Sequence, residues 1–219
     1  MDDNAAQERT QSYASYLALD EILGAQRPLS DEHDEMLFIV VHQVYELWFK
    51  QLLHELDHAQ VELERGEGTH ALHTLKRVLT ILKVVVAQID VLETMTPRQF
   101  LSFRERLSTA SGFQSRQFRE LEELLPTMFD SLVRYLGVRG DIQDALVEVY
   151  RADDIGAQLC ERFVDLDEGL QEWRYRHVKM VERTIGAAHG TGGSKGAAYL
   201  RSTLFQPVFP ELWAVRDRL

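Results

Sequence analysis

The amino-acid sequence predicts an all-α fold in a single domain. Apolar residues recur at spacings of three and four along most of the chain, which is the period of an amphipathic helix rather than that of a strand. Only five prolines occur in 219 residues, and none lies between Pro28 and Pro97, so long helices can run uninterrupted there. No internal repeat or low-complexity tract divides the chain. We therefore expect residues 1–219 to form one bundle of long antiparallel helices.

Two long helices and a short one are expected in the first half of the chain. Ser30 and Asp31 are good N-cap residues for the first helix, and Gly66 and Gly68 end it. An apolar stripe of period 3.6 defines the second helix. Pro97 begins the third, since proline is well tolerated in a first helical turn. The expected helices cover residues 30–65, 69–93 and 97–107.

Helical periodicity continues in the second half, over residues 114–135, 141–150 and 155–185. The sequence HGTGGSKG at residues 189–196 is rich in glycine, which predicts a mobile loop or a tight turn. A final helical piece, broken by two prolines, follows this loop. The polar residues 1–11 are expected to be a disordered tail.

Charge and cysteine content restrict the partners of the chain. A formal net charge of −11 argues against nucleic acid and anionic membrane surfaces, because both would repel it. The longest apolar run, residues 36–41, is far too short to span a membrane, and no signal-peptide core is visible. Cys160 is the only cysteine, which excludes an internal disulfide and fits a reducing compartment. We expect a cytoplasmic protein that binds small molecules and copies of itself.

The stretch HELDH matches the pattern H-E-x-x-H, in which two histidines one helical turn apart bind zinc and the glutamate activates a water molecule. Zinc peptidases of this type place the motif helix beside a sheet that binds the substrate, but no strand pattern precedes the motif in this chain. Val61 also stands where one class of zinc peptidases has the glycine that turns the chain toward a third ligand. A zinc peptidase acting through His54, Glu55 and His58 is therefore a remote alternative to a solvated helix face.

Two other histidines lie among apolar residues instead of among charges. Phe38, His42, Tyr45 and Phe49 follow one another at offsets of four, three and four, so His42 lies within an aromatic stripe. His177, in WRYRH, shares a stripe with apolar residues of another long helix. Each could be a core histidine bonded to a neighbouring carbonyl. Two inward histidines on separate helices could instead enclose a planar cofactor, as helical bundles do for haem.

The chain resembles the tryptophan 2,3-dioxygenase family, a family of haem enzymes, and looks like a shortened member of it. The resemblance spans nearly the whole length, and its segments occur in the family's order. They are SYASYLALDEILGAQ, HDEMLFIVVHQVYELWFKQLLHELD, VLETMTPRQFLSFRERL, SGFQS, WRYRHVKMVERTIG, GTGGSKG and FPELWAVR. The family's long helix commonly reads H-E-L-D, so His58 alone completes the zinc pattern.

The resemblance implies a role for several residues. His177 matches the proximal ligand of the haem iron, and His42 matches the distal histidine that receives the indole N–H of tryptophan. Phe38 and Phe103 would wall the indole slot. Arg104 matches the arginine that binds the substrate carboxylate, for which a planar cation with two prongs is well suited.

Further matches concern the rim of the site. Thr191, in the glycine-rich loop, matches a threonine that meets the substrate ammonium and carboxylate when that loop closes. Ser111 and Gly112 match the segment over the haem edge. Tyr13 and Tyr16 match aromatic residues that reach into a neighbouring subunit's site. The resemblance therefore implies a homo-oligomer, a tetramer or a dimer.

Two departures from the family pattern are visible. Phe100 belongs to the substrate site by its position, but the family usually has a tyrosine there, so one hydroxyl near the substrate carboxylate is missing. The region between SGFQS and WRYRH, residues 116–172, is much shorter than is common in the family. We expect one or two helices to be absent or shortened there, which leaves the subunit arrangement and the pocket rim open.

The expected function is that of a haem-dependent oxygenase with non-covalent haem b. Dioxygen would be inserted into the indole C2–C3 bond of L-tryptophan to give N-formylkynurenine. An alternative is a monooxygenase that makes a hydroxylated or oxindole product from tryptophan or a 3-substituted tryptophan, such as β-methyltryptophan. A helical interaction module without a cofactor is a third possibility. Neither GSKG as a phosphate loop nor Cys160 as a haem thiolate has a suitable sequence setting.

Overall fold

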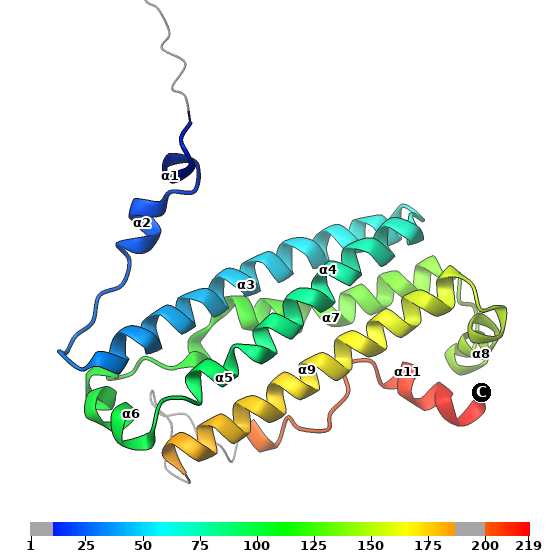
Figure 1. Ribbon diagram of the computed structural model, residues 1–219. Helices are drawn as coiled ribbons and strands as arrows, with labels where there is room; N and C mark the ends of the chain where they lie inside the picture. The colour runs from blue at the N-terminus through cyan, green and yellow to red at the C-terminus, as the bar shows by residue number, and fades with distance from the viewer. Residues whose placement is uncertain (1–10, 187–199) are drawn as a thin grey trace, which may run out of the picture.

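The computed structural model describes residues 11–186 and 200–219 (Figure 1). Every regular element within these residues is a helix, so the predicted all-α fold is confirmed. The expected tail, apart from its last residue, and the expected glycine-rich loop with Thr191 lie outside the described residues. None of the helices in the two described stretches combines the length and the apolar character needed to cross a bilayer.

Four long helices form the body of the molecule. They are α3 (His33–Glu64), α4 (Gly68–Ala87), α7 (Arg116–Tyr135) and α9 (Ile155–Ile185). Helix α3 packs along both α4 and α7, and α9 packs along α4, so the four run side by side (Figure 1). A Cβ on Gly169 would lie 2.6 Å from a methyl carbon of Leu82, which shows how closely α4 and α9 approach. The predicted bundle of long helices is thus observed.

Helix α3 begins at His33, within the stretch of residues 30–33 that was expected to cap it. Its N-cap position is occupied by Glu32, which makes no side-chain cap. Ser30 is not the cap, because its hydroxyl donates to the Glu35 carboxylate instead. The other end lies close to the expected place, since Gly66 has φ of 76° and turns the chain toward α4.

The expected second helix is interrupted. Helix α4 ends at Ala87, and the short α5 (Ile89–Leu92) follows it. The carbonyl of Val85, which would accept from the N–H of residue 89 in a regular helix, accepts from the Tyr45 hydroxyl at 3.0 Å. The side chain of Gln88 donates to the carbonyl of Val41 at 2.8 Å. Contacts with α3, which periodicity does not reveal, therefore determine where this helix breaks.

Shorter helices connect the long ones. Thr96 and Gln99 form a capping box at the start of α6 (Pro97–Phe103), which tightens into the 3-10 helix η1 (Arg104–Leu107). A second 3-10 turn, η2 (Gly112–Gln114), leads into α7. Asp141 caps α8 (Ile142–Ala152), which crosses to the start of α9. The sequence predicted these elements to within a few residues.

The C-terminal segment is fixed to the body by one carboxylate. Helix α11 (Pro210–Ala214) and the 3-10 helix η4 (Val215–Arg218) lie against α8 and α9. Asp167 of α9 is fully buried and accepts from the backbone N–H of Val208 and Phe209 and from the indole N–H of Trp213, at 2.8, 3.1 and 2.9 Å. Three donors from one segment thus meet a single buried oxygen.

The N-terminal segment, unlike the C-terminal one, does not pack along the bundle. Helices α1 (Tyr13–Tyr16) and α2 (Leu19–Leu23) project away from the bundle as an arm (Figure 1). Tyr13 and Tyr16 are 76% and 72% exposed. The arm, residues 11–24, joins the body through a root that we define as residues 25–30.

Candidate functional site

The two inward histidines come together at one end of the bundle. His42 lies near the start of α3, and His177 lies near the end of α9. Burial and, to a lesser degree, the nearby His42 together lower the pKa of His177 to about 4. Burial also lowers the pKa of His42, although its bond to Phe38 and the charge of Glu46 oppose this shift. Both rings are therefore neutral at neutral pH, with unprotonated nitrogen available in each.

The bundle has one long helix fewer at this end. Helix α7 begins only at Arg116, and Gln117 donates to the carbonyl of Glu46, one turn beyond His42 along α3. Burial changes along the aromatic stripe accordingly: Tyr45 and Phe49 are buried, whereas Phe38 and His42 are only half-buried. On α9 likewise, Leu170 is buried while Trp173 and His177 keep accessible surface. The inward faces are therefore least covered where the histidines lie.

A local hydrogen bond orients His42. Its Nδ1–H donates to the carbonyl of Phe38 at 2.7 Å, because a carbonyl can only accept. The Phe38 ring lies 4.1 Å from the imidazole, centroid to centroid. This bond to a neighbouring carbonyl agrees with the interpretation of His42 as a core histidine, but it uses only one of the two ring nitrogens. Nε2 is left as an acceptor on the free edge of the ring.

His177 is oriented by stacking. Its ring lies parallel to the Trp173 indole, with an interplanar angle of 14° and centroids 5.2 Å apart. No hydrogen bond holds the His177 ring within residues 11–186 and 200–219. A neutral imidazole with an unused nitrogen at a partly accessible apolar face suits an iron porphyrin. The residues present therefore fit the cofactor that the resemblance implies.

Trp173 has a polar group of its own at this level of the bundle. Its indole nitrogen is buried and has no hydrogen-bond partner of normal geometry in the described part of the chain. Burial raises the pKa of Tyr45 to about 12, although the nearby Trp173 side chain opposes this rise. The indole thus fixes the plane of the His177 ring without using either of its nitrogens.

Phenylalanines wall the space next to His42. Helix α6 brings Phe100 and Phe103 within 5.9 and 5.7 Å of Phe38, measured between ring centroids. Phe103 is fully buried and Phe100 is 9% exposed. Arg104 comes directly after this cluster, where α6 tightens into η1, and is half-buried. The structure therefore brings the two expected wall residues, Phe38 and Phe103, together with Phe100, the distal histidine and the chain segment that carries the expected carboxylate ligand.

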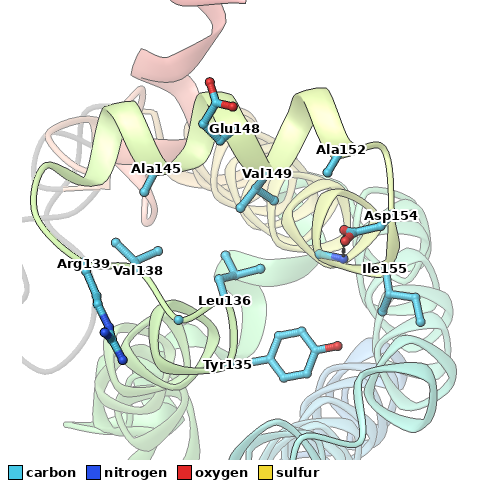
Figure 2. Close-up of a pocket in the computed structure, with 12 residues that line it drawn as sticks. Tyr135, Leu136, Val138, Arg139, Ala145, Glu148, Val149, Ala152, Asp154 and Ile155 are labelled. Atoms are coloured by element: carbon cyan, nitrogen blue, oxygen red, sulfur yellow. Dashed lines mark hydrogen bonds between the residues drawn. The ribbon is translucent and has the colours of Figure 1, made fainter.

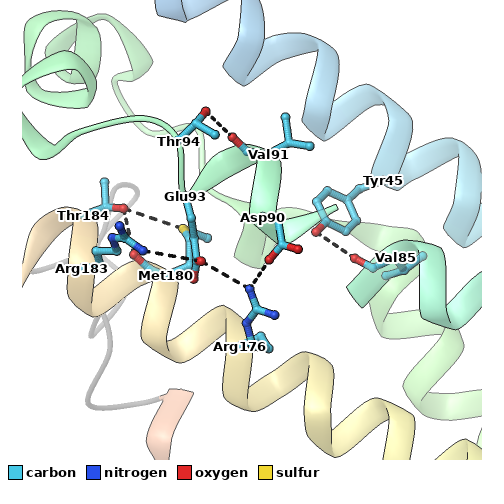
Figure 3. A network of polar contacts seen from close by, with 10 residues as sticks. All are labelled: Tyr45, Val85, Asp90, Val91, Glu93, Thr94, Arg176, Met180, Arg183 and Thr184. Atoms are coloured by element: carbon cyan, nitrogen blue, oxygen red, sulfur yellow. Dashed lines mark hydrogen bonds and ion pairs between the residues drawn. The ribbon is translucent and has the colours of Figure 1, made fainter. Parts of the chain in front are cut away.

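A charged network outside the stripe holds this end of α9 (Figure 3). Arg176, next to His177, donates to Asp90 at 2.5 Å and to Glu93 at 3.3 Å, and Arg183 lies 3.6 Å from Glu93. These contacts tie α5 to α9 and oppose rotation of the helix that carries His177. Sequence analysis did not identify this network, although the spacing of seven between the two arginines places both on one helix face.

The remaining expected site residues are placed differently. Ser111 is half-buried and Gly112 is exposed, and both lie in the connection between η1 and α7. Tyr13 and Tyr16 are strongly exposed, on an arm that projects away from the bundle of their own chain (Figure 1). Thr191 lies outside the described residues. The described residues of one chain therefore assemble only part of the expected site.

The zinc alternative finds no support in the geometry. Glu55 is 5% exposed, and its carboxylate is held by Arg77 at 2.9 Å and by Gln51 at 2.7 Å. It cannot act as a free base in that arrangement. His58 is paired with Glu62, and no three metal-binding side chains converge within the described residues. HELDH is part of an ion-paired helix face.

A hollow lies at the other end of the bundle. About 700 Å³ opens between the end of α7, α8 and the start of α9, beside Tyr135, Leu136 and Ile155 (Figure 2). Asp154 caps α9 here by accepting from the N–H of Gly156 at 2.7 Å. His177 lies some 22 residues along the same helix, roughly 30 Å away at 1.5 Å per residue. None of the expected site residues lines this hollow.

Comparison with known proteins gives a consistent result. The family profile described as tryptophan 2,3-dioxygenase matches residues 2–139 and 133–219. A tryptophan 2,3-dioxygenase from Anaeromyxobacter dehalogenans is 58% identical over the whole of both chains. One from Herpetosiphon aurantiacus is 49% identical over 95% of this chain and 98% of its own. One from Caulobacter vibrioides is 41% identical over 98% of this chain and all of its own.

The same comparisons show where this chain is short. The alignment with the Anaeromyxobacter dehalogenans protein runs over 265 positions, so at least 265 − 219 = 46 of them lie opposite gaps in this chain. The two stretches of the family profile overlap at residues 133–139, the turn after α7. We infer that the relatives carry additional residues near this turn, which agrees with the expected shortening of residues 116–172.

Proposed function

Because the chain belongs to the tryptophan 2,3-dioxygenase family, we propose that it is a haem-dependent enzyme that inserts dioxygen into the C2–C3 bond of the indole of L-tryptophan, giving N-formylkynurenine. The observation that carries the proposal is the pair of neutral histidines, His42 and His177, at the end of the bundle where their faces are least covered. We also propose a cytoplasmic location, which the single cysteine supports.

The proposed cofactor is haem b held without a covalent link. His177 would hold the iron through its unused ring nitrogen, with Ser111 and Gly112 along the haem edge. Cys160 is fully buried and burial raises its thiol pKa to about 12, so it is unsuited both to covalent attachment and to thiolate ligation. Bound haem would supply the activation of dioxygen, which no side chain of this chain can provide.

The contribution of the protein is to place the substrate. Nε2 of His42 can accept the indole N–H, because Nδ1–H is already committed to the Phe38 carbonyl. Phe38, Phe100 and Phe103 would pack on the indole and exclude water from it. Arg104 would bind the carboxylate of the amino acid through two parallel hydrogen bonds. His42 thus orients the ring and need not remove a proton.

Two further parts of the site lie beyond one chain's described residues. Thr191 would meet the ammonium and carboxylate of the substrate. Tyr13 and Tyr16 of a second copy would complete the pocket, which fits their exposure on a projecting arm. The proposal therefore includes a homo-oligomer, a dimer or a tetramer.

The test begins with purified protein supplied with haem. The expected result is a Soret band and, after anaerobic reduction and addition of L-tryptophan and oxygen, a product heavier than tryptophan by two oxygen atoms. A product heavier by one oxygen atom would contradict dioxygenation and indicate the monooxygenase alternative. Protein that binds no haem would overturn the proposal.

Two substitutions separate the cofactor from the substrate. His177→Ala should abolish haem binding or shift its spectrum. Arg104→Ala should keep haem and raise the KM for L-tryptophan by about 10- to 100-fold, the equivalent of about 1.5–3 kcal/mol for a charge-assisted hydrogen bond. Arg98→Ala, an exposed arginine of α6, is the matched control and should leave KM unchanged. Normal turnover by Arg104→Ala would refute the substrate assignment.

A further inference from the structure

The root of the N-terminal arm is held more firmly than the arm itself. Helices α1 and α2 contact each other, whereas the root, residues 25–30, is bonded to α3 at two places. We propose that Glu35 and Gln43 of α3 are positioning residues, which aim the arm of one copy of this chain into the site of a second copy. The inference rests on the proposed function and adds to it the residues that determine the direction of the arm.

Glu35 holds the end of the root nearer to α3. Its carboxylate accepts from the N–H of Leu29 and the N–H of Ser30, both at 2.8 Å, and from the Ser30 hydroxyl at 2.5 Å. The side chain is only 2% exposed although it lies in the first turn of its helix. Burial by itself raises the pKa of Glu35, but these hydrogen bonds and the charge of Arg106 outweigh burial and leave the pKa below its usual value. The carboxylate is therefore ionised, and it fixes the backbone of two consecutive root residues.

Gln43 holds the end of the root nearer to the arm. Its side-chain oxygen accepts from the Gln26 amide at 2.6 Å, and its own amide donates to the carbonyl of Ala25 at 3.3 Å. Gln26 also donates to the carbonyl of Ile22 at 2.9 Å, which links the root to the last turn of α2. The two attachment points lie two turns apart on one rigid helix, so together they define a direction and not merely a point of attachment.

The arm carries apolar surface that its own chain leaves uncovered. Tyr13, Tyr16 and Leu23 are each more than 70% exposed, and Ile22 is 42% exposed. So much exposed apolar surface on a short arm indicates that another molecule covers it. The arm points away from the bundle of its own chain (Figure 1).

A second copy of this chain is the partner that fits. The outer face of α3 beside the root exposes a further apolar stripe, Met36, Val40 and Leu47, at 43%, 38% and 51%. An arm and an apolar helix face on the same chain suit a symmetric exchange, in which each copy gives its arm to the other. The root then fixes the direction of the arm relative to α3 of its own copy, and so the position of the arm in the pocket of the partner.

A purely local role for the two residues is the alternative. Glu35 lies one turn before Phe38, and Gln43 follows His42 directly, so a disturbance of α3 could damage the site of the same chain. The two explanations differ in which subunit is affected. A positioning role harms the partner's site, whereas a local role harms the site of the substituted chain.

Three variants of the haem-loaded protein provide the first comparison. Glu35→Gln keeps the shape of the side chain but turns an amide NH₂ toward N–H donors. Gln26→Ala breaks the second attachment from the arm side and leaves α3 untouched. Both Glu35→Gln and Gln26→Ala should raise the KM for L-tryptophan about tenfold, the equivalent of one hydrogen bond, while haem content stays normal. Glu32→Gln removes the same charge at an exposed position three residues earlier and should leave KM unchanged.

Mixed oligomers give the decisive result. Glu35→Gln subunits are assembled with an excess of Arg104→Ala subunits, whose own sites bind tryptophan poorly but whose arms are intact. If the arm acts in the partner's site, the KM of the Glu35→Gln sites returns toward the wild-type value. No recovery on mixing would overturn the inference, as would an unchanged KM in either single variant.

Two further outcomes separate this inference from the proposed function. Wild-type protein that oxidises tryptophan but is a monomer by light scattering would overturn the inference and the proposed oligomer, while the proposed reaction would stand. Wild-type protein that takes up haem without oxidising tryptophan would remove the proposed function and the inference with it.

Discussion

At the scale of single residues, the position of a side chain and its hydrogen bonds have separate origins. The aromatic stripe of α3 predicted that His42 faces inward, and it does. The direction of its proton depends on the bond from Nδ1 to the Phe38 carbonyl, which requires the actual ring orientation. That bond leaves Nε2 as an acceptor, and burial keeps the ring neutral by lowering its pKa.

His42→Ala tests the acceptor role directly. The variant should lose about 1 kcal/mol of binding to an indole N–H, so kcat/KM for L-tryptophan should fall roughly five- to tenfold. 1-Methyl-L-tryptophan has no N–H to donate and should lose little or nothing. The measurement is the ratio of kcat/KM for the two substrates. Equal losses for both would show that His42 only fills space, and His33→Ala, at the exposed start of α3, is the control.

At the scale of helices, α9 combines two tasks along one length. Its first half carries the buried Asp167, which collects three donors of the C-terminal segment, and its second half carries His177. Arg176 fixes the same helix to α5. The orientation of His177 therefore depends on interactions of α9 with parts of the chain that are distant in sequence.

Asp167→Ala should destabilise the protein strongly. Three donors, one buried and two partly buried, lose their acceptor, and each unsatisfied group costs about 1 kcal/mol, so the free energy of unfolding should fall by about 3 kcal/mol. Denaturant unfolding measures this loss, and limited proteolysis should show faster cleavage within residues 200–219. Asp165→Ala breaks only an exposed pair with Arg162 and should cost less than about 1 kcal/mol. Similar losses in both variants would contradict this account.

At the scale of the whole molecule, the two ends of the bundle serve different purposes. The histidines and the phenylalanine cluster occupy one end, and the hollow between α7, α8 and α9 occupies the other (Figures 1 and 2). From the overlap of the family matches at residues 133–139 we infer that the relatives' additional residues lie at the end with the hollow. The shortening therefore spares the residues to which we assign the chemistry.

An insertion tests this separation of the two ends. Six glycine and serine residues between Arg139 and Gly140 lengthen an exposed turn, in which Gly140 has φ of 85°. The free energy of unfolding should change by less than about 1 kcal/mol and the KM for L-tryptophan should not change. The same insertion after Gln88, which bonds to Val41 beside His42, should reduce activity severely. Equal sensitivity at both sites would show that the two ends are coupled.

The sequence by itself determined the fold class, the long helices and the inward position of both histidines. These follow from the spacing of apolar residues, which is local information and survives in a single sequence. Where a helix boundary differs from the one expected, a side-chain contact explains it. The Tyr45 hydroxyl donates to the Val85 carbonyl, and the Ser30 hydroxyl donates to Glu35 instead of capping the helix.

Only the tertiary structure decided which groups meet. It brought His42 to His177, paired Glu55 of HELDH with Arg77, and turned the arm with Tyr13 and Tyr16 away from the bundle of its own chain. Such pairings depend on how whole helices pack in three dimensions, and spacing along the chain carries no record of that packing. The physical reason is that periodicity determines on which face of its own helix a residue lies, whereas the packing of helices determines which face of another helix lies against it.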